Sequence, residues 1–492
     1  MLAQLPALQI VIPLLAAPAC LLLRRDRLAW LVSTLASAAA LVVAALLLSR
    51  TMEAGPIAYQ LGGWPPPWGI EFRIDVVNAL VLLIVAAIAT AVLPFARTSI
   101  EREIAEHRAT LFYTSYLLCL TGLLGITITG DAFNLFVFLE ISSLASYVLI
   151  SLNRDRRGLT SAFQYLIMGT IGATFLLIGI GMLYMMTGTL NMADLAARLP
   201  AVAETRTVHT AFAFLVVGVG LKLALFPLHL WLPNAYTYAP SAVTAFLAAT
   251  STKVAVYVLL RFVFTVFGVE LSFGMMPLTE ILIVLAVAAI LSMSTVAIAQ
   301  DNVKRLLAYS SIAQIGYMVL GIALATAAGL TAAVLHLFNH ALMKGALFLA
   351  LGCVFYRVGS VRLQAMHGIG QQMPWTMAAF VVGGLSLIGV PLTAGFISKW
   401  YLVLAALEQG WWPLAVVILG GSLLAVVYVW RVVEAAYFRP PSEQAAGATE
   451  APLSMLAPTW GLAAANVYFG LDTRLSIGAA TRAAEALLGG GP

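Results

Sequence analysis

Residues 220–228 read GLKLALFPL, and residues 384–392 read GLSLIGVPL. Five of the nine positions are identical, including the proline. Both stretches lie inside long apolar segments, where a proline removes a backbone hydrogen bond and leaves carbonyl groups free for water or cations. Ordinary proline kinks are the alternative explanation for either stretch alone. The paired occurrence, each with a lysine nearby, predicts two interrupted helices at matching positions of a repeated structure.

The composition places the chain in a membrane. Of its 492 residues, 62% are hydrophobic and 10% are charged, whereas soluble proteins carry roughly 25% charged residues. The net charge of +5 comes mainly from polar loops between apolar segments, so it does not indicate a nucleic-acid partner. The three cysteines lie in apolar runs without ligand-like spacing, which disfavours disulfides, zinc and iron–sulfur clusters. We expect an integral membrane protein without a bound cofactor.

The apolar segments predict the number of membrane crossings. At about 20 residues per span, the chain holds fourteen candidate helices, of which the last is the weakest. They run roughly over residues 5–23, 28–48, 76–95, 109–129, 132–152, 159–187, 207–232, 238–267, 277–298, 308–327, 329–356, 375–405, 411–437 and 453–470. The fold class is therefore an all-α polytopic membrane protein with about fourteen transmembrane helices.

The two proline-interrupted segments predict how this chain is divided. They fall in helices seven and twelve, and an odd offset of five spans inverts the second copy relative to the first. We therefore expect two inverted five-helix repeats with broken helices at seven and twelve. The expected units are residues 1–108 (helices one to three), 109–267 (helices four to eight), 268–440 (helices nine to thirteen) and 441–492 (helix fourteen and a tail).

The arginines predict the orientation in the membrane. They gather in alternate loops, around residues 24–27, 97–108, 154–157, 357–362 and 439. Because basic loops stay on the cytoplasmic side, this bias through the first thirteen spans predicts an N-terminus outside. We expect a multi-pass protein of the bacterial inner (cell) membrane.

An acid and a lysine lie in apolar sequence of the first repeat. Glu140 is the one acid expected deep in the membrane, in the middle of helix five, and Lys222 lies beside the break in helix seven. A lysine in hydrocarbon costs about 2.5–3.5 kcal/mol on insertion scales, so its retention suggests a functional role. We expect Glu140 to control whether Lys222 holds or releases a proton. The alternative is a static structural ion pair.

Further ionisable residues continue the pattern into the second repeat. Lys253 lies in helix eight and Lys399 in helix twelve, while His336, His340 and Lys344 recur every four residues along helix eleven. Residues four apart share one helix face. Histidine and lysine can each accept and release a proton, so the series predicts a proton relay at mid-membrane. A satisfied polar contact is the alternative for any single histidine, and haem ligation is disfavoured because both histidines lie on one helix.

Three other basic residues receive structural interpretations. Arg261 follows Lys253 by eight residues and either shares its face or extends towards the outer surface, which we favour. Lys304 and Arg305 precede helix ten, beside Asp301, and we expect loop contacts without a role in transport.

Several motifs resemble the proton-conducting antiporter-like family, the large membrane subunits of Mrp-type Na⁺/H⁺ antiporters, respiratory complex I and membrane-bound hydrogenases. The motifs are ALMKG at 341–345, AYSSI at 308–312, PLHLWLPNAY at 227–236 and GFISKW at 395–400. The resemblance covers about residues 75–440. It implies a fold of fourteen helices with two inverted repeats. It also implies that Glu140 and Lys222 form the family's acid–lysine pair, that Lys253 is the connecting lysine, that His336, His340 and Lys344 form the central relay, and that Lys399 is the terminal lysine.

The resemblance implies a function within a larger assembly. Length and the lysine at position 399 favour the D-type subunit of an Mrp antiporter, exchanging protons for Na⁺, K⁺ or Li⁺ together with other antiporter subunits. The alternative is a proton-translocating subunit of a complex I-like or hydrogenase redox enzyme, and a third possibility is a passive membrane scaffold. No carboxylate cluster suggests a sodium site, so the metal-binding residues are left unknown.

Overall fold

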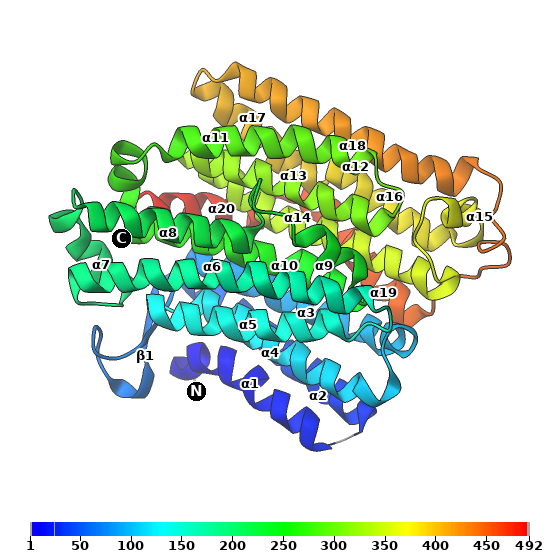
Figure 1. The fold of residues 1–492 in the computed structure, drawn as a ribbon, viewed down its shortest axis with the longest axis horizontal. Helices are drawn as coiled ribbons and strands as arrows, with labels where there is room; N and C mark the ends of the chain where they lie inside the picture. Colours follow the sequence, from blue (N-terminus) through cyan, green and yellow to red (C-terminus); the bar gives the residue numbers. More distant parts are fainter. Residues whose placement is uncertain (1, 24, 490–492) are drawn as a thin grey trace.

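The computed structural model describes residues 2–23 and 25–489 of the chain. The molecule is a bundle of long helices lying side by side (Figure 1). The helices are α1 (Leu5–Leu23), α2 (Asp26–Ala54), α3 (Val76–Glu103), α4 (Ala109–Ile128), α5 (Ala132–Ser151), α6 (Arg157–Thr187), α7 (Met192–Arg198), α8 (Arg206–Leu223), α9 (Leu232–Tyr238), α10 (Ser241–Leu260), α11 (Leu278–Ala288), α12 (Ser294–Ile298), α13 (Val303–Ala323), α14 (Ala327–Val358), α15 (Ile369–Gln372), α16 (Pro374–Ile388), α17 (Ala394–Glu408), α18 (Trp412–Phe438), α19 (Leu453–Leu471) and α20 (Arg474–Leu487).

The predicted all-α polytopic fold is confirmed. Within the described residues, twelve helices are long and apolar enough to cross a membrane. The broken pair α16 and α17, each of 15 residues, accounts for the predicted twelfth span. The 19-residue α19 lies at the fourteenth. The described residues therefore have a helical segment at each of the fourteen expected places, and twelve of these have the length and hydropathy of a membrane crossing.

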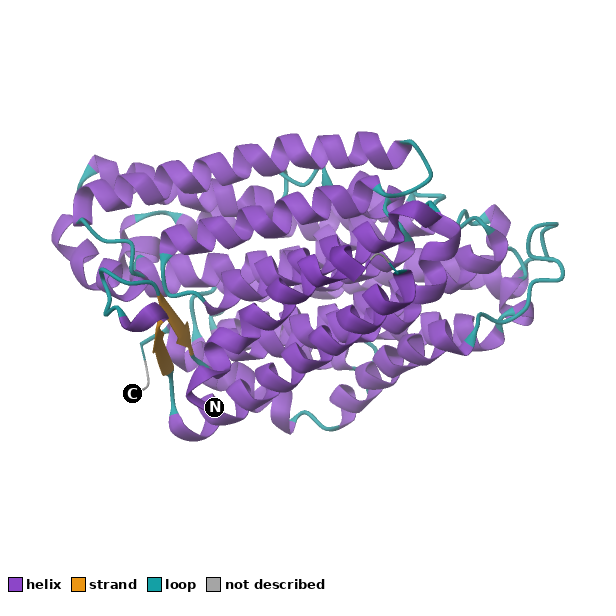
Figure 2. Cartoon of the chain, turned by 90° about the horizontal axis from the view of Figure 1, so that it is seen from below, coloured by secondary structure: helices purple, strands orange, loops and turns teal. Residues whose placement is uncertain are grey.

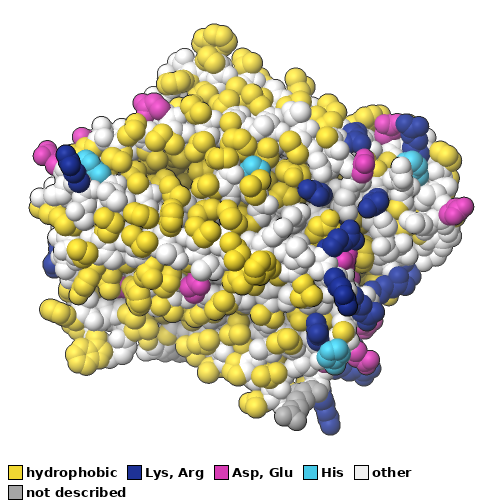
Figure 3. Space-filling model, viewed as in Figure 1, with side chains coloured by type: hydrophobic (Ala, Val, Ile, Leu, Met, Phe, Trp, Pro, Cys, Tyr) yellow, Lys and Arg dark blue, Asp and Glu magenta, His cyan; other side chains and the backbone are white. Residues whose placement is uncertain are grey.

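The two ends of the bundle differ in charge and in structure. Both chain ends lie at one end of the molecule (Figure 1), and a short antiparallel hairpin of β1 (Ile57–Gln60) and β2 (Glu71–Ile74) lies there too (Figure 2). We call this end the N-terminal side. Lysine and arginine gather at the opposite end on the face seen in Figure 3, which we call the basic side. The broad hydrophobic band between these ends is what a lipid-facing surface requires.

Both expected helix breaks are present. The predicted helix seven ends early, because α8 stops at Leu223 and the chain turns before α9 begins at Leu232. The predicted helix twelve divides into α16 and α17. Each first segment ends in a left-handed residue, Ala224 with φ 58° and Gly389 with φ 91°. These residues turn the chain out of the helix and leave the last carbonyls without helical partners.

One helix boundary corrects the sequence prediction. Helix α13 begins at Val303 rather than near residue 308, since the Asn302 side chain accepts a hydrogen bond from the backbone of Arg305 and caps the helix. Lys304 is therefore helical and buried, and its assignment to a loop is wrong.

The C-terminal tail also contains a helix that was not predicted. Helix α20 packs on α14 and α3. Its buried face consists of Ser476, Ala479, Ala480, Ala483, Ala484 and Leu487. This spacing of three and four residues is the signal that identifies an amphipathic helix.

Candidate functional site

The acid and lysine expected to pair in the first repeat lie next to each other. Helix α5 carries Glu140 and α8 carries Lys222, with Nζ of the lysine 3.7 Å from Oε1 of the glutamate. The lysine also donates to the Ser143 hydroxyl at 2.8 Å. The Lys222 side chain is 7% exposed and that of Glu140 is 30% exposed, so the carboxylate is less buried than its sequence position suggests. At an effective dielectric constant near 20, this separation gives an attraction of about 4.5 kcal/mol.

A small polar cavity of about 30 Å³ lies beside Lys222. The hydroxyls of Ser142, Ser143, Ser146 and Ser251 line it, the last of these from α10. A water molecule needs roughly 10–15 Å³ measured this way and two to four polar partners, so the cavity has room for about two waters. The space therefore connects the Lys222 ammonium with the helix that carries Lys253.

Lys253 is fully buried near the middle of α10. Its ammonium donates to the backbone carbonyl of Ala248 and, at 3.4 Å, to the Thr252 hydroxyl. These partners are neutral, and α10 packs along α14. Lys253 therefore lies between the first repeat and the helix that carries the histidines.

The two histidines of α14 occupy different environments. His336 is held by two hydrogen bonds of 2.9 Å, to the Ser398 hydroxyl and the Gln314 amide oxygen. The parallel ring of His340 lies 6.0 Å away between centroids, and among the described residues neither of its nitrogens has a hydrogen-bond partner. Buried imidazole nitrogens normally have partners, so His340 is the histidine with both positions open to water or a proton.

Neutral groups hold the two lysines of the second repeat. Lys344 donates to the Leu307 carbonyl at 2.8 Å and to the Ser310 hydroxyl, both on α13. Lys399 donates to the carbonyls of Leu387 and Ile388, each at 3.0 Å. Those carbonyls are exposed by the helix break, because α16 ends at Ile388.

Lys399 has two more partners that connect it to the histidines. It donates to the Ser422 hydroxyl at 3.0 Å, and its ammonium lies 4.8 Å from the Tyr317 ring centroid. That ring is 5.6 Å from His336. Tyr317 therefore fills the gap between Lys399 and His336, a position that the sequence did not identify.

Six of the seven predicted residues are buried in the bundle and Glu140 is partly exposed, and the seven do not form one continuous hydrogen-bonded chain. Glu140 contacts Lys222 directly, and His336, His340 and Lys344 share one face of α14. Serines, carbonyls and aromatic rings separate the remaining members. A proton path through these residues therefore needs water or side-chain movement between them.

Two buried ion pairs were not anticipated. Lys304 lies 3.9 Å from Glu103, and each side chain is 4% exposed. Arg261 contacts Asp75 at 2.5 Å. Both acids lie at the ends of α3, within short polar breaks of the sequence, and nothing local to them indicates their distant partners. No group of three or more His, Cys, Asp or Glu side chains suited to a metal ion occurs in the described part of the chain.

These features define a class of protein: a polytopic membrane protein with two broken helices and buried ionisable groups in its core. The family described as NADH:quinone oxidoreductase/Mrp antiporter, TM, matches residues 129–425. The chain belongs to this family of membrane subunits of ion-translocating complexes, either antiporter or complex I-like.

Individual relatives point to both kinds of complex. The chain is 44% identical to NADH-quinone oxidoreductase subunit N of Desulforudis audaxviator, over 96% of each chain. It is 30% identical to the D-type subunit of the Na⁺/H⁺ antiporter of Bacillus subtilis, over 98% of this chain and 96% of that protein. A subunit in the structure of the Mrp complex from Dietzia sp. DQ12-45-1b superposes with a TM-score of 0.90, at 27% identity, covering 99% of this chain and 97% of that chain.

Proposed function

We propose that this chain conducts protons through the membrane along Glu140, Lys222, Lys253, His340, His336, Lys344 and Lys399. The observation that carries the proposal is the burial of four lysines, spread over both repeats, in a bundle where they contact hydroxyls and carbonyls. Four buried ammonium groups are costly unless they release protons or interact with an anion. Residues 109–267 and 268–440 then act as two half-pathways, flanked by residues 1–108 and 441–492.

Glu140 acts as the control point of the first half. Its carboxylate stabilises the protonated form of Lys222, as the 3.7 Å separation requires. Movement or neutralisation of the carboxylate destabilises that ammonium. The proton can then pass through the serine-lined cavity towards α10 and Lys253.

His340 supplies the central step. A neutral imidazole accepts a proton on one nitrogen and releases another from the second nitrogen. Both ring nitrogens of His340 are without hydrogen-bond partners in the described structure. The ring also lies between His336 and Lys344 along α14. Protons therefore leave α14 either towards Lys344 or, through His336 and Tyr317, towards Lys399.

We propose a multi-subunit antiporter, exchanging Na⁺ for protons, as the assembly in which this chain works. Its support is the likeness to the D-type antiporter subunit over nearly the full length of both chains and to a subunit of the Mrp complex. The other antiporter subunits are the proposed partners. The proposed location is the bacterial cell membrane with the N-terminus outside, following the predicted charge bias of the loops.

A redox complex is the second candidate assembly, and one observation favours it. The NADH-quinone oxidoreductase relative is 44% identical, compared with 30% for the antiporter relative. In such a complex the same relay would move protons, while partner subunits would carry out the electron transfer.

The complex is purified by means of an affinity tag on this chain and reconstituted into vesicles. This experiment tests both the proposed relay and the proposed assembly. Proton flux into vesicles is followed with a pH-sensitive dye, first driven by a Na⁺ or K⁺ gradient and then by a quinone and a reductant. Flux driven by the cation gradient supports the antiporter, and flux driven only by electron transfer supports the redox complex. Full flux in a complex carrying Lys253→Ala would overturn the relay in either assembly.

A further inference from the structure

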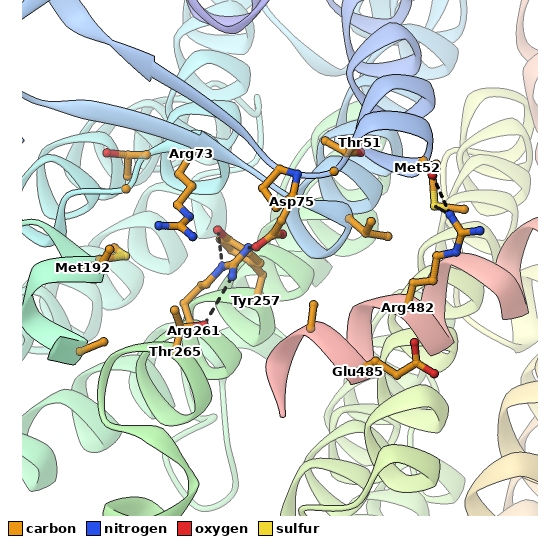
Figure 4. Close-up of a pocket in the computed structure, with 18 residues that line it drawn as sticks. Thr51, Met52, Arg73, Asp75, Met192, Tyr257, Arg261, Thr265, Arg482 and Glu485 are labelled. Atoms are coloured by element: carbon orange, nitrogen blue, oxygen red, sulfur yellow. Dashed lines mark hydrogen bonds and ion pairs between the residues drawn. The ribbon is translucent and has the colours of Figure 1, made fainter. Parts of the chain in front are cut away.

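A large cleft opens on the N-terminal side of the molecule. Its volume is about 690 Å³, and its walls are formed by the ends of α2 and α10, the beginnings of α3 and α7, and α20 (Figure 4). Arg73, Arg482 and Glu485 are among its polar lining residues. The cleft therefore provides aqueous space that penetrates the end of the helix bundle.

A buried ion pair lies at the inner end of this cleft. Arg261 holds both carboxylate oxygens of Asp75 through one nitrogen, at 2.5 and 2.6 Å, and the two side chains are 10% and 15% exposed. Burial acts to raise the pKa of Asp75, but the charge and hydrogen bonds of Arg261 outweigh it and lower that pKa. The pair is thus ionised and joins the start of α3 to the end of α10.

The same arginine touches a tyrosine that leads further into the bundle. Nε of Arg261 donates to the Tyr257 hydroxyl at 3.0 Å. Tyr257 lines the cleft although its side chain is 1% exposed. With its oxygen accepting from the arginine, the hydroxyl keeps its own proton available for donation.

Lys253, Tyr257 and Arg261 follow one another at intervals of four residues. Such residues stack on one helix face, with Cβ atoms about 5–6 Å apart. Side chains in a helix also lean towards its N-terminus, which directs Arg261 towards Tyr257 and Tyr257 towards the level of Lys253. The cleft consequently reaches to within one helical turn of a residue in the proposed relay.

We propose that this cleft is the aqueous mouth through which the relay exchanges protons with the N-terminal side, and that the Asp75–Arg261 pair is its gate. The inference rests on the proposed proton-conducting function. In the outward step, Tyr257 gives its hydroxyl proton to water in the cleft and takes one from the Lys253 ammonium, which becomes a neutral amine. Lys253 reaches the tyrosine by turning its flexible side chain away from the Ala248 carbonyl.

The gate follows from the position of the guanidinium. While Arg261 holds Asp75 and donates to the Tyr257 hydroxyl, the paired side chains cover that hydroxyl and keep the cleft water from the deeper part of α10. Separation of the pair lets water reach the Tyr257 hydroxyl. A purely structural clamp between α3 and α10 would predict no change in access when the pair is removed from a folded protein.

Cysteine labelling tests the mouth and the gate without measuring transport. Thr265→Cys places a thiol in the cleft lining, and Lys253→Cys places one a turn below Tyr257. A charged, membrane-impermeant thiol reagent should modify Thr265→Cys only from the N-terminal side, in vesicles of known orientation. Lys253→Cys should be modified at least about tenfold faster when combined with Arg261→Ala. Absence of labelling at position 265 overturns the mouth, and equal labelling at position 253 with and without Arg261 overturns the gate.

The matched control is Arg198→Ala on the same side. Arg198 pairs with Asp194, but its side chain is 47% exposed and the pair lies outside the cleft lining. Its removal should leave the labelling rate of Lys253→Cys unchanged. An equal rise in the labelling rate would mean that access reflects general loosening, and this would overturn the gate.

Tyr257→Phe provides a second test that leaves the ion pair in place. Loss of the hydroxyl should slow proton flux of the reconstituted complex by at least about 100-fold, the lower end of what a positioned proton-transfer group contributes. If Lys253→Ala abolishes flux while Tyr257→Phe and Arg261→Lys leave it unchanged, the relay stands and the mouth is overturned. If Lys253→Ala itself leaves flux intact, the proposed function fails first.

Discussion

The two broken helices stabilise their lysines by different means. In the first repeat, Lys222 precedes the break and faces a carboxylate, Glu140, at 3.7 Å. In the second repeat, Lys399 follows the break and donates to the free carbonyls of Leu387 and Ile388. A helix C-terminus carries roughly half a negative charge. The end of α16 therefore takes the place that a carboxylate holds in the other repeat.

This difference indicates that the stabilisation of the lysine can be changed in the first repeat but not in the second. A carboxylate can be protonated or moved, so the stabilisation of Lys222 can be switched on and off. Backbone carbonyls do not titrate, so the stabilisation of Lys399 is constant as long as the break keeps its geometry. Under the proposed function, the first repeat is the regulated half of the pathway, and the second repeat is its fixed continuation.

The largest effect is expected from removing either lysine. Lys222→Ala and Lys399→Ala should each reduce proton flux of the reconstituted complex at least about 100-fold, because each removes a proton-carrying group from a pathway in series. Flux into vesicles measured with a pH-sensitive dye checks this. Near-normal flux in one of the two variants would show that its repeat is not part of the pathway.

Glu140→Gln should produce the next largest effect. The change keeps the size and polarity of the side chain but removes an attraction of about 4.5 kcal/mol on the Lys222 ammonium. Side-chain exposure of 30% at Glu140 weakens that figure, so we expect flux to fall about 10- to 100-fold. The control is Glu434→Gln, measured with the same dye assay. This change removes the acid of the Glu434–Arg439 ion pair, in which both side chains are more exposed than those of the Glu140–Lys222 pair. Equal fluxes in these two variants would argue against a switch at Glu140.

The hydroxyl partners of the two lysines offer a sharper comparison. Ser422→Ala removes one of three hydrogen bonds to Lys399, and Ser143→Ala removes the hydroxyl beside Lys222. A single hydrogen bond contributes about 0.5–1.5 kcal/mol net, so Ser422→Ala should slow flux about three- to tenfold. Ser143→Ala should have a smaller effect, since the carboxylate still stabilises Lys222. The reverse order would show that hydroxyls rather than Glu140 hold the first lysine.

The sequence predicted those features of the fold that depend on local pattern. Repeated apolar segments marked the crossings, and the matching prolines at 227 and 391 located both breaks. Burial of Glu140 and Lys222 in apolar sequence was enough to suggest their pairing, because a lone charge in lipid needs a partner. Their roles in transport remain predictions.

The features that were missed depend on distant segments or on backbone ends. Glu103 and Lys304 are about two hundred residues apart and pair only because α3 ends and α13 begins at the same side of the bundle. Two of the partners of Lys399 are backbone carbonyl groups, which every residue has, so no side-chain pattern indicates them. Tyr317 was missed because an aromatic residue in an apolar helix ordinarily packs in the hydrophobic core.

The smallest effect concerns the residue that ends each helix before the break. Gly389 has φ 91°, and a Cβ atom there would lie 3.0 Å from Cδ of Lys399. Ala224, at the matching place in the first repeat, accepts a left-handed conformation that costs a non-glycine residue roughly 1–2 kcal/mol. The second repeat favours glycine here because the Lys399 side chain lies against this position, so that an added Cβ atom would push it aside.

Exchanging these residues tests that explanation. Gly389→Ala should lower the melting temperature of the purified complex and displace Lys399. Ala224→Gly should raise the melting temperature slightly, by about 1 °C. The change relieves backbone strain in the folded protein but increases the conformational entropy of the unfolded chain, and the net gain in the free energy of unfolding is less than about 1 kcal/mol. Thermal unfolding followed by intrinsic fluorescence measures both variants. If neither Gly389→Ala nor Ala224→Gly lowers the melting temperature, the second break has space for a Cβ atom at position 389. The carbonyls of the break would then hold Lys399 less rigidly than the proposed constant stabilisation of this lysine requires.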